Sequence, residues 1–313
     1  MSQTNHKIMF AGLDVAKSSL QLHWAGKFHC LTNDAAGWRR LLKLLAAQPG
    51  VHVICEATGG YEQAVVEALQ AATLAVSVVE AGRVRHFARA KGLRAKTDPI
   101  DAAVLTQYGQ AFHPASTAAV EPRQRQLSAL AARRRQLIDL KIIEQNRAGH
   151  YADGFSKKQS RQLLALLEKQ IEQCDQQIAQ LIEQDPLLNS KAQRLKTIPG
   201  VGSTTAASVL ADMPELGCLS PSAAAALAGV APYDRQSGHS DRQRHIGGGR
   251  KSIRCALYMA TLSAVRHDRI LREFYQRLRT AGKPAKLALT ACMRKLIMLM
   301  NRLIKNPQFS LAT

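Results

Sequence analysis

The sequence has no apolar run of the roughly 18 residues that a membrane span requires, so we expect no transmembrane helix. Its first seven residues are polar and lack the hydrophobic segment of a signal peptide, which favours a cytoplasmic protein. The six cysteines form neither C-x-x-C pairs nor a disulfide framework, and the histidines include no H-x₃-H pair. We therefore expect reduced thiols and no zinc site.

Acidic residues are scarce, and their shortage leaves a formal charge of +20, from 43 Lys and Arg against 23 Asp and Glu. Residues 1–113 carry a net +4, residues 114–190 a net +2, and residues 191–313 a net +14. A positive excess concentrated in one segment indicates a polyanionic partner, most often nucleic acid. Because 46% of the 313 residues are hydrophobic, the chain has enough apolar material for two or three folded units.

Short apolar stretches alternate with helical ones in residues 1–113. We expect strands at 7–14, 19–24, 28–31, 51–55 and 74–79, and helices at 33–46, 61–72 and 82–91. Asn33 is expected to cap the first helix, and Ala25–Lys27 to form a tight turn between two strands. Strands that alternate with helices indicate an α/β domain in which helices pack on a central sheet.

Two helical stretches dominate residues 114–190. Between Leu164 and Leu181 apolar residues recur at alternating spacings of three and four, which is the seam of a coiled coil. With a second helix at 123–147 this predicts an antiparallel hairpin, which either dimerises or packs within one chain. Residues 191–313 are expected to be mainly helical, with helices at 220–228, 252–267 and 285–305, whereas the polar residues 234–249 indicate a loop.

Four acids in the first segment point to one site. Asp14 and Glu56 close predicted strands, while Asp98 and Asp101 follow the expected N-cap Thr97 and share one helix face. Such acids can converge at the carboxyl edge of an α/β sheet, where they would repel one another without a bound cation. Oxygen ligands select Mg²⁺ or Mn²⁺, which can support phosphoryl transfer. The alternative is that each acid is only a cap or turn residue.

The stretch TIPGVG at residues 197–202 precedes an Ala-rich helix and is typical of a helix-hairpin-helix element. Its glycines allow a tight turn, and backbone N–H groups at the start of the next helix can hold a phosphate without reading base sequence. We expect Thr197, Gly200 and Gly202 to contact nucleic acid here. An ordinary connection between two helices is the alternative.

Residues 234–254 place Ser237 and Ser240 among many cations. The basic side chains that we expect to bind nucleic acid here are Arg235, Arg242, Arg244, Arg250, Lys251 and Arg254. Serine is a poor nucleophile unless a base, a metal or positive charge activates it. The spacing alone therefore favours a phosphate-binding surface over a catalytic one.

Five motifs occur in order along the chain: GLDVAK (12–17), CEATGGY (55–61), KTDPIDA (96–102), TIPGVG (197–202) and SG (237–238). The intervening sequence fits as well, including LYMA (257–260) and AGKPAKLALTACMRKL (281–296). Together they resemble the DEDD insertion-sequence transposases related to the Piv DNA invertases, the IS110 family, and most closely its branch with subterminal inverted repeats. The resemblance covers nearly the whole chain.

This resemblance implies three parts. Residues 1–113 would form an RNase H-like (Holliday-junction-resolvase-like) catalytic domain that binds divalent metal, residues 114–190 a coiled-coil dimerisation hairpin, and residues 191–313 a mainly α-helical transposase domain. The metal ligands would be Asp14, Glu56, Asp98 and Asp101. The catalytic nucleophile would be Ser237, five residues after Pro232, although Ser240 lies close enough that the assignment needs a test.

The resemblance also implies the partners. Family members act as homodimers and homotetramers, in which the acids and the serine come from different protomers, and recombine donor and target DNA under the guidance of a bridge RNA. Our leading hypothesis is a transposase that works through a phosphoserine intermediate. The alternatives are a resolvase-like nuclease that uses metal-activated water, and a non-catalytic nucleic-acid scaffold.

Overall fold

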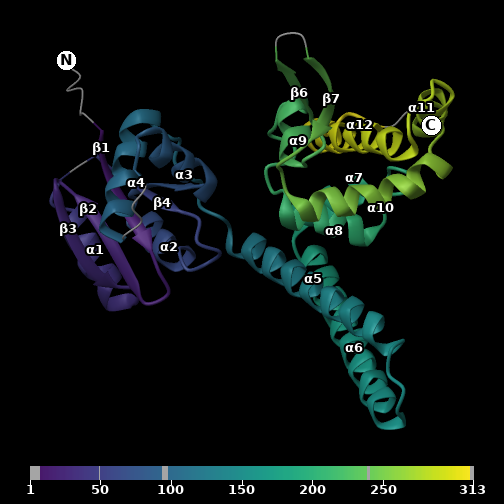
Figure 1. Cartoon of the computed structure of the whole chain (residues 1–313), viewed down its shortest axis with the longest axis horizontal. Coiled ribbons are helices and arrows are strands. Elements are labelled where there is room, and N and C mark those ends of the chain that lie inside the picture. The colour runs from purple at the N-terminus through teal and green to yellow at the C-terminus, as the bar shows by residue number, and fades with distance from the viewer. Residues whose placement is uncertain (1–7, 49, 94–97, 238–239, 311–313) are drawn as a thin grey trace. The chain divides into compact units, whose positions relative to one another are not determined.

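The computed structural model describes residues 8–48, 50–93, 98–237 and 240–310, with the backbone alone at 98, 99, 235–237 and 240–243. The chain divides into two units, Met1–Val120 and Glu121–Thr313, which are described separately (Figure 1). Among the described residues no helix is long and apolar enough to cross a membrane. The six cysteines all carry free thiols, as expected.

A five-stranded sheet forms the centre of the first unit, in the order β3-β2-β1-β4-β5. Its strands are β1 (Met9–Val15), β2 (Ser19–Trp24), β3 (Lys27–Thr32), β4 (Val51–Glu56) and β5 (Ala75–Val79). The first three strands form an antiparallel meander, while β4 and β5 run parallel to β1. Ala25 and Gly26 join β2 to β3 with φ angles of +49° and +74°, which confirms the predicted tight turn.

Helices cover both faces of this sheet. They are α1 (Ala35–Leu45), α2 (Gln63–Ala71), α3 (Ala81–Ala90) and α4 (Asp98–Phe112). Because side chains alternate along a strand, Leu13 of β1 packs in a cluster with α1 and α2, whereas Phe10 packs in a cluster with α3 and α4. The predicted mixed α/β architecture is confirmed, and it is compatible with an RNase H-like domain.

The N-cap of α1 is Asp34, so the expectation that Asn33 caps this helix is wrong. The Asp34 carboxylate accepts hydrogen bonds from the backbone N–H groups of Ala36 and Gly37 at 3.0 and 2.8 Å. Asn33 instead accepts a hydrogen bond from the Trp38 indole at 2.9 Å. Both residue types are good caps, and the packing of Trp38 selects between them.

The second unit is mainly helical, as expected. Its helices are α5 (Pro122–Ala148), α6 (Gly154–Glu183), α7 (Pro186–Lys196), α8 (Ser203–Asp212), α9 (Pro221–Leu227), α10 (Lys251–His267), α11 (Arg269–Thr280) and α12 (Ala285–Lys305). The helices α5 and α6 form the predicted antiparallel hairpin, whose far end projects from the remaining helices (Figure 1). Near its base, Leu127 and Ile178 belong to the same core cluster as Leu257 and Leu296.

Two features of this unit differ from the sequence-based expectations. The stretch 234–249 is not a simple loop, because β6 (Pro232–Ser237) and β7 (Ser240–Ile246) pair there as an antiparallel ribbon. A two-stranded ribbon needs no apolar face when its pairing comes from backbone hydrogen bonds, so hydrophobic patterning did not indicate it. The second difference is the highly charged helix α11, because no helix was expected between residues 267 and 285.

Candidate functional site

Asp14 and Glu56 lie at the same level of the sheet. The preceding residues, Leu13 and Cys55, are register partners on the parallel strands β1 and β4. Asp14 is the sixth residue of β1, and Glu56 is the last residue of β4. Both are partly buried. Both residues therefore lie at the carboxyl edge of neighbouring parallel strands, where α/β sheets place their ligands.

The helix α4 brings a third acid to this edge because Gly12 has no side chain. A Cβ atom at Gly12 would overlap the carbonyl oxygen of Ala102 and would lie 2.6 Å from the Thr106 backbone nitrogen. The first turns of α4 thus pack directly on β1. Asp101, which immediately precedes Ala102, lies in that turn and is partly buried.

The chemistry of these residues fits a hard divalent cation, since carboxylate oxygens are the ligands that Mg²⁺ and Mn²⁺ prefer. The structure brings Asp14, Glu56 and Asp101 to one edge, while the side chain of Asp98, the first residue of α4, lies outside the described residues. Within the described part of the chain, no three Asp, Glu, His or Cys side chains form a metal-ligand group. The types of donor thus suit such a cation, but the described side chains do not by themselves form its site.

Glu62 is a supporting residue that was not expected from the sequence. Its carboxylate accepts hydrogen bonds from the Thr58 hydroxyl and from the backbone N–H groups of Thr58 and Gly60, at 2.8, 3.1 and 2.9 Å. Burial alone would raise the pKa of Glu62, but these hydrogen bonds outweigh it and lower the pKa. Glu62 thus fixes the turn that follows Glu56. Its position four residues after a threonine in CEATGGYE was the available signal.

Ser237 lies at the tip of the β6–β7 ribbon. It is the last residue of β6 and is the backbone register partner of Ser240, the first residue of β7, while Arg235 pairs in register with Arg242. The side chains of these four residues, with Gly238 and His239, lie outside the described residues. The backbone thus places both candidate serines at one turn, and the choice of Ser237 as the nucleophile stays a prediction.

The other predicted cations of this region divide into two groups. Arg244 is exposed and pairs with Asp234 at 2.5 Å on the ribbon, and Lys251 is exposed at the start of α10. Arg250 instead donates to both carboxylate oxygens of Glu215 at 2.7 Å. Arg254 donates to the carbonyl oxygen of Gly248 at 2.9 Å. The last two guanidinium groups thus hold the base of the ribbon.

The TIPGVG segment joins α7 to α8, as the helix-hairpin-helix prediction requires. Gly200 has a φ of +90°, and a Cβ there would lie 2.5 Å from the Ala264 backbone nitrogen of α10, so this glycine serves close packing. Gly202 is exposed and caps α8 without any side-chain hydrogen bond. Thr197 is exposed too, but its hydroxyl donates to the carbonyl oxygen of Arg194 at 2.7 Å. Gly202 and Thr197 can therefore still face a ligand.

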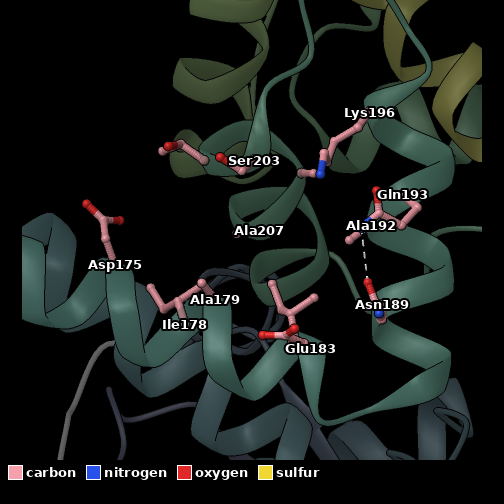
Figure 2. Close-up of a pocket in the computed structure, with 13 residues that line it drawn as sticks. Asp175, Ile178, Ala179, Glu183, Asn189, Ala192, Gln193, Lys196, Ser203 and Ala207 are labelled. Carbon is pink, nitrogen blue, oxygen red and sulfur yellow. Dashed lines mark hydrogen bonds between the residues drawn. The ribbon is translucent and has the colours of Figure 1, made fainter.

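A cavity of about 490 Å³ lies beside this segment, between α6, α7 and α8 (Figure 2). Lys196 and Ser203, which flank the TIPGVG segment, line one side of the cavity. Asp175 and Glu183 of α6 line the other side. Asp175 is already paired with Arg134 at 2.5 Å. Two carboxylates on the α6 side limit anion binding to the side of Lys196.

Two family models match the chain. One, described as the transposase IS116/IS110/IS902 family, matches residues 192–276, and a DEDD transposase model of the IS110 type matches residues 11–155. The pilin gene-inverting protein of Moraxella bovis is 31% identical over 304 residues, which cover 92% of this chain and 93% of the relative, and that of Moraxella lacunata matches equally well. An uncharacterized 43.6 kDa protein of insertion element IS110 from Streptomyces coelicolor is 30% identical over 149 residues, which cover 47% of this chain and 36% of that protein.

Proposed function

The chain belongs to the IS116/IS110/IS902 family of transposases, and on that premise we propose that it cuts and rejoins donor and target DNA with four metal-binding carboxylates and a serine nucleophile. The observation that supports the proposal is the shared level of Asp14 and Glu56 on neighbouring parallel strands, with the turn of α4 that contains Asp101 packed on the same strand β1. The named relatives invert a pilin gene, and inversion requires DNA strands to be cut and rejoined. Transposition and inversion can therefore share one chemistry.

The proposed metal site consists of Asp14, Glu56, Asp98 and Asp101, which would hold Mg²⁺ or Mn²⁺. When bound, such an ion stabilises negative charge on a phosphate during its transfer. The chain would position these ligands in two ways. The register of β1 and β4 sets Asp14 and Glu56 at one level, and the close approach of α4 to Gly12 would allow the acids of α4 to reach the same edge. Glu62 keeps the turn after Glu56 rigid.

The proposed nucleophile is Ser237. Its hydroxyl oxygen would form an ester bond to the scissile phosphorus and lose its proton, while the bond to the leaving sugar oxygen breaks and that oxygen takes up a proton. Attack by the hydroxyl of another strand would reverse this exchange and release the serine. Arg235 and Arg242, register partners in the same ribbon, would offset the phosphate charge.

We extend the proposal to the partners of the protein and to the role of each segment of the chain. Residues 1–113 would bind metal, residues 114–190 would dimerise, and residues 191–313 would grip nucleic acid with their net charge of +14. Homodimers would assemble into tetramers, a bridge RNA would guide the choice of DNA, and the protein would act in the cytoplasm. Support comes from family membership and from the uneven charge.

Covalent trapping tests the nucleophile. The full chain is incubated with Mg²⁺, guide RNA and end-labelled donor and target DNA, and the products are separated under denaturing conditions after brief proteolysis. We expect a labelled protein–DNA adduct with the unchanged chain and with the matched control Ser240→Ala, and none with Ser237→Ala. An adduct that survives Ser237→Ala but not Ser240→Ala would reassign the nucleophile. Cleavage without any adduct would favour a nuclease that uses water.

A further inference from the structure

A second hollow in the C-terminal unit is lined by residues of α10, α11 and α12. It forms where α10 turns into α11 at a single residue, Asp268, which ends one helix and caps the next. The end of α10 and the first half of α11 therefore lie side by side and border an open cavity of about 450 Å³ over α12. This volume lies in the range of about 300–1,000 Å³ that small-ligand sites occupy.

The cavity has an apolar part and a polar part. Leu262 and Val265 of α10 and the buried Leu289 of α12 supply the apolar lining. Arg266 of α10 and two residues of α11, Arg272 and Gln276, supply the polar lining. These residues recur at spacings of three and four along each helix, so they share one helix face.

The aromatic residue of this cavity is Tyr275, which is partly exposed beside Arg272. Its neighbour Phe274 is already engaged, because Arg277 and Lys295 lie over its ring at 5.3 and 4.0 Å from the centroid. Arg272 is held in place by a hydrogen bond to the backbone carbonyl of Arg266, across the corner between the helices. That contact uses one of the five N–H donors of a guanidinium group, so the others can serve a ligand.

The electrostatic setting excludes cationic ligands. Residues 251–313 contain thirteen Lys and Arg against two acids, Asp268 and Glu273. Asp268 accepts a hydrogen bond from the Leu271 backbone N–H at 2.7 Å, and Glu273 pairs with Arg269 at 2.9 Å. No carboxylate is among the described residues that line the cavity. The ligand must therefore combine a flat or apolar body with negative charge.

We propose that this cavity binds one unpaired nucleotide of a nucleic-acid strand, with the base against Tyr275 and the apolar lining and the phosphate on Arg266 and Arg272. Aromatic rings stack on bases of any sequence, and arginine pairs with phosphate at two points. Gln276 supplies an amide for the edge of the base. Bases inside a duplex are already stacked and paired, so they cannot enter. This inference rests on the proposed nucleic-acid partner but not on the cutting chemistry.

Binding of short labelled oligonucleotides to the full chain tests the site. The probe is a uridine strand of about 12 nucleotides that carries 2-aminopurine, whose fluorescence falls when it stacks on an aromatic ring. We expect Tyr275→Leu to weaken single-strand binding about tenfold and to abolish the quenching, whereas Tyr275→Phe, which keeps the ring, retains both. Arg272→Ala should weaken binding more than Arg277→Ala, a matched control on the same helix with the same loss of charge.

A duplex of the same sequence is the second control. Its affinity should change less than about twofold with Tyr275→Leu, because it contacts only the general positive charge. Equal losses for duplex and single strand, or unchanged quenching in Tyr275→Leu, would overturn the proposal. Matched RNA and DNA strands distinguish the two sources of an unpaired nucleotide, since RNA alone has a 2′-hydroxyl. Because the assay has no cutting step, a failure of the proposed cleavage chemistry leaves its result intact.

Discussion

Arg250 and Glu215 form a two-point ion pair in which Nη1 lies 2.7 Å from Oε2 and Nη2 lies 2.7 Å from Oε1. Arg250 directly precedes α10, and its backbone N–H donates to the carbonyl oxygen of Leu227 at 2.8 Å. Its guanidinium also donates to the Asp212 carbonyl oxygen at 2.8 Å. The ribbon that carries Ser237 is thus anchored at its base by polar contacts. Arg250 has a structural role, beyond the nucleic-acid contact expected from its charge.

Removing this pair should destabilise the second unit. We expect Glu215→Gln to lower the free energy of unfolding by about 1 kcal/mol, because both partners are partly exposed and water screens the loss. Urea unfolding followed by circular dichroism measures this. The matched control is Glu273→Gln, which breaks the exposed pair with Arg269 and should cost less stability than Glu215→Gln, because water screens this pair more strongly. Equal costs for the two variants would contradict the anchoring role of Arg250.

Acid should weaken the turn after Glu56 through Glu62. Because the pKa of Glu62 is lowered in the folded chain, its contribution to stability is complete above the unfolded pKa of about 4.3 and is lost as the pH falls through the folded pKa. Urea unfolding at neutral and acidic pH should therefore show a smaller loss of stability in Glu62→Gln than in the unchanged chain. Thr58→Val, which removes one donor, should lie between them. An unchanged pH dependence in Glu62→Gln would refute this role.

Gly12→Ala should separate α4 from β1. The added Cβ would overlap the carbonyl oxygen of Ala102 and would lie 2.6 Å from the Thr106 backbone nitrogen, and backbone atoms cannot move aside as a side-chain end can. We expect a loss of about 1–3 kcal/mol of stability, together with loss of DNA cleavage. Gly149→Ala is the control, since Gly149 has a φ of −69° and open space around it. Full cleavage by Gly12→Ala would show that the close approach of α4 is not needed.

Removal of divalent metal should abolish cleavage while DNA binding persists. EDTA should stop adduct formation, and Mg²⁺ or Mn²⁺ should restore it, because the proposed carboxylates act only with a bound cation. Asp14→Asn and Glu56→Gln should each lower the cleavage rate at least about a hundredfold. Gel-shift assays on the same variants should show unchanged affinity, because the net charge of +14 lies in another segment. Equal activity in EDTA and Mg²⁺ would refute the metal role.

The hairpin offers a test of dimerisation. The seam residues Leu167, Ile178 and Leu181 are buried within the chain. They therefore pack inside one chain, which is one of the two alternatives for the coiled-coil pattern. Leu163 and Leu166, which lie off the seam, remain 43% and 51% exposed. If these leucines contact a second copy, Leu163→Lys combined with Leu166→Lys should shift the mass measured by light scattering toward the monomer. The same shift with Leu187→Lys, an exposed leucine on α7, would indicate a nonspecific effect.

Local patterns predicted most elements of the fold. The largely apolar run of β4 and the β2–β3 turn at Ala25–Gly26 follow from strand and turn chemistry that acts over a few residues. The cap of α1 required the packing of Trp38, and the β6–β7 ribbon required backbone pairing that no hydrophobic pattern encodes. Expectations therefore succeeded where hydrophobic pattern and turn chemistry decide an element, and failed where side-chain packing or backbone pairing decides it.

The same division applies to the site. The sequence alone determined which acids stand at strand ends, where positive charge accumulates, and that its ordered motifs resemble a transposase family. Only the tertiary structure decided that Asp14 and Glu56 share a level, through the register of Leu13 with Cys55, and that Gly12 admits the turn carrying Asp101. It also assigned Arg250 to an internal ion pair with Glu215. Charge and spacing are properties of the chain, whereas register and close approach depend on which segments pack together.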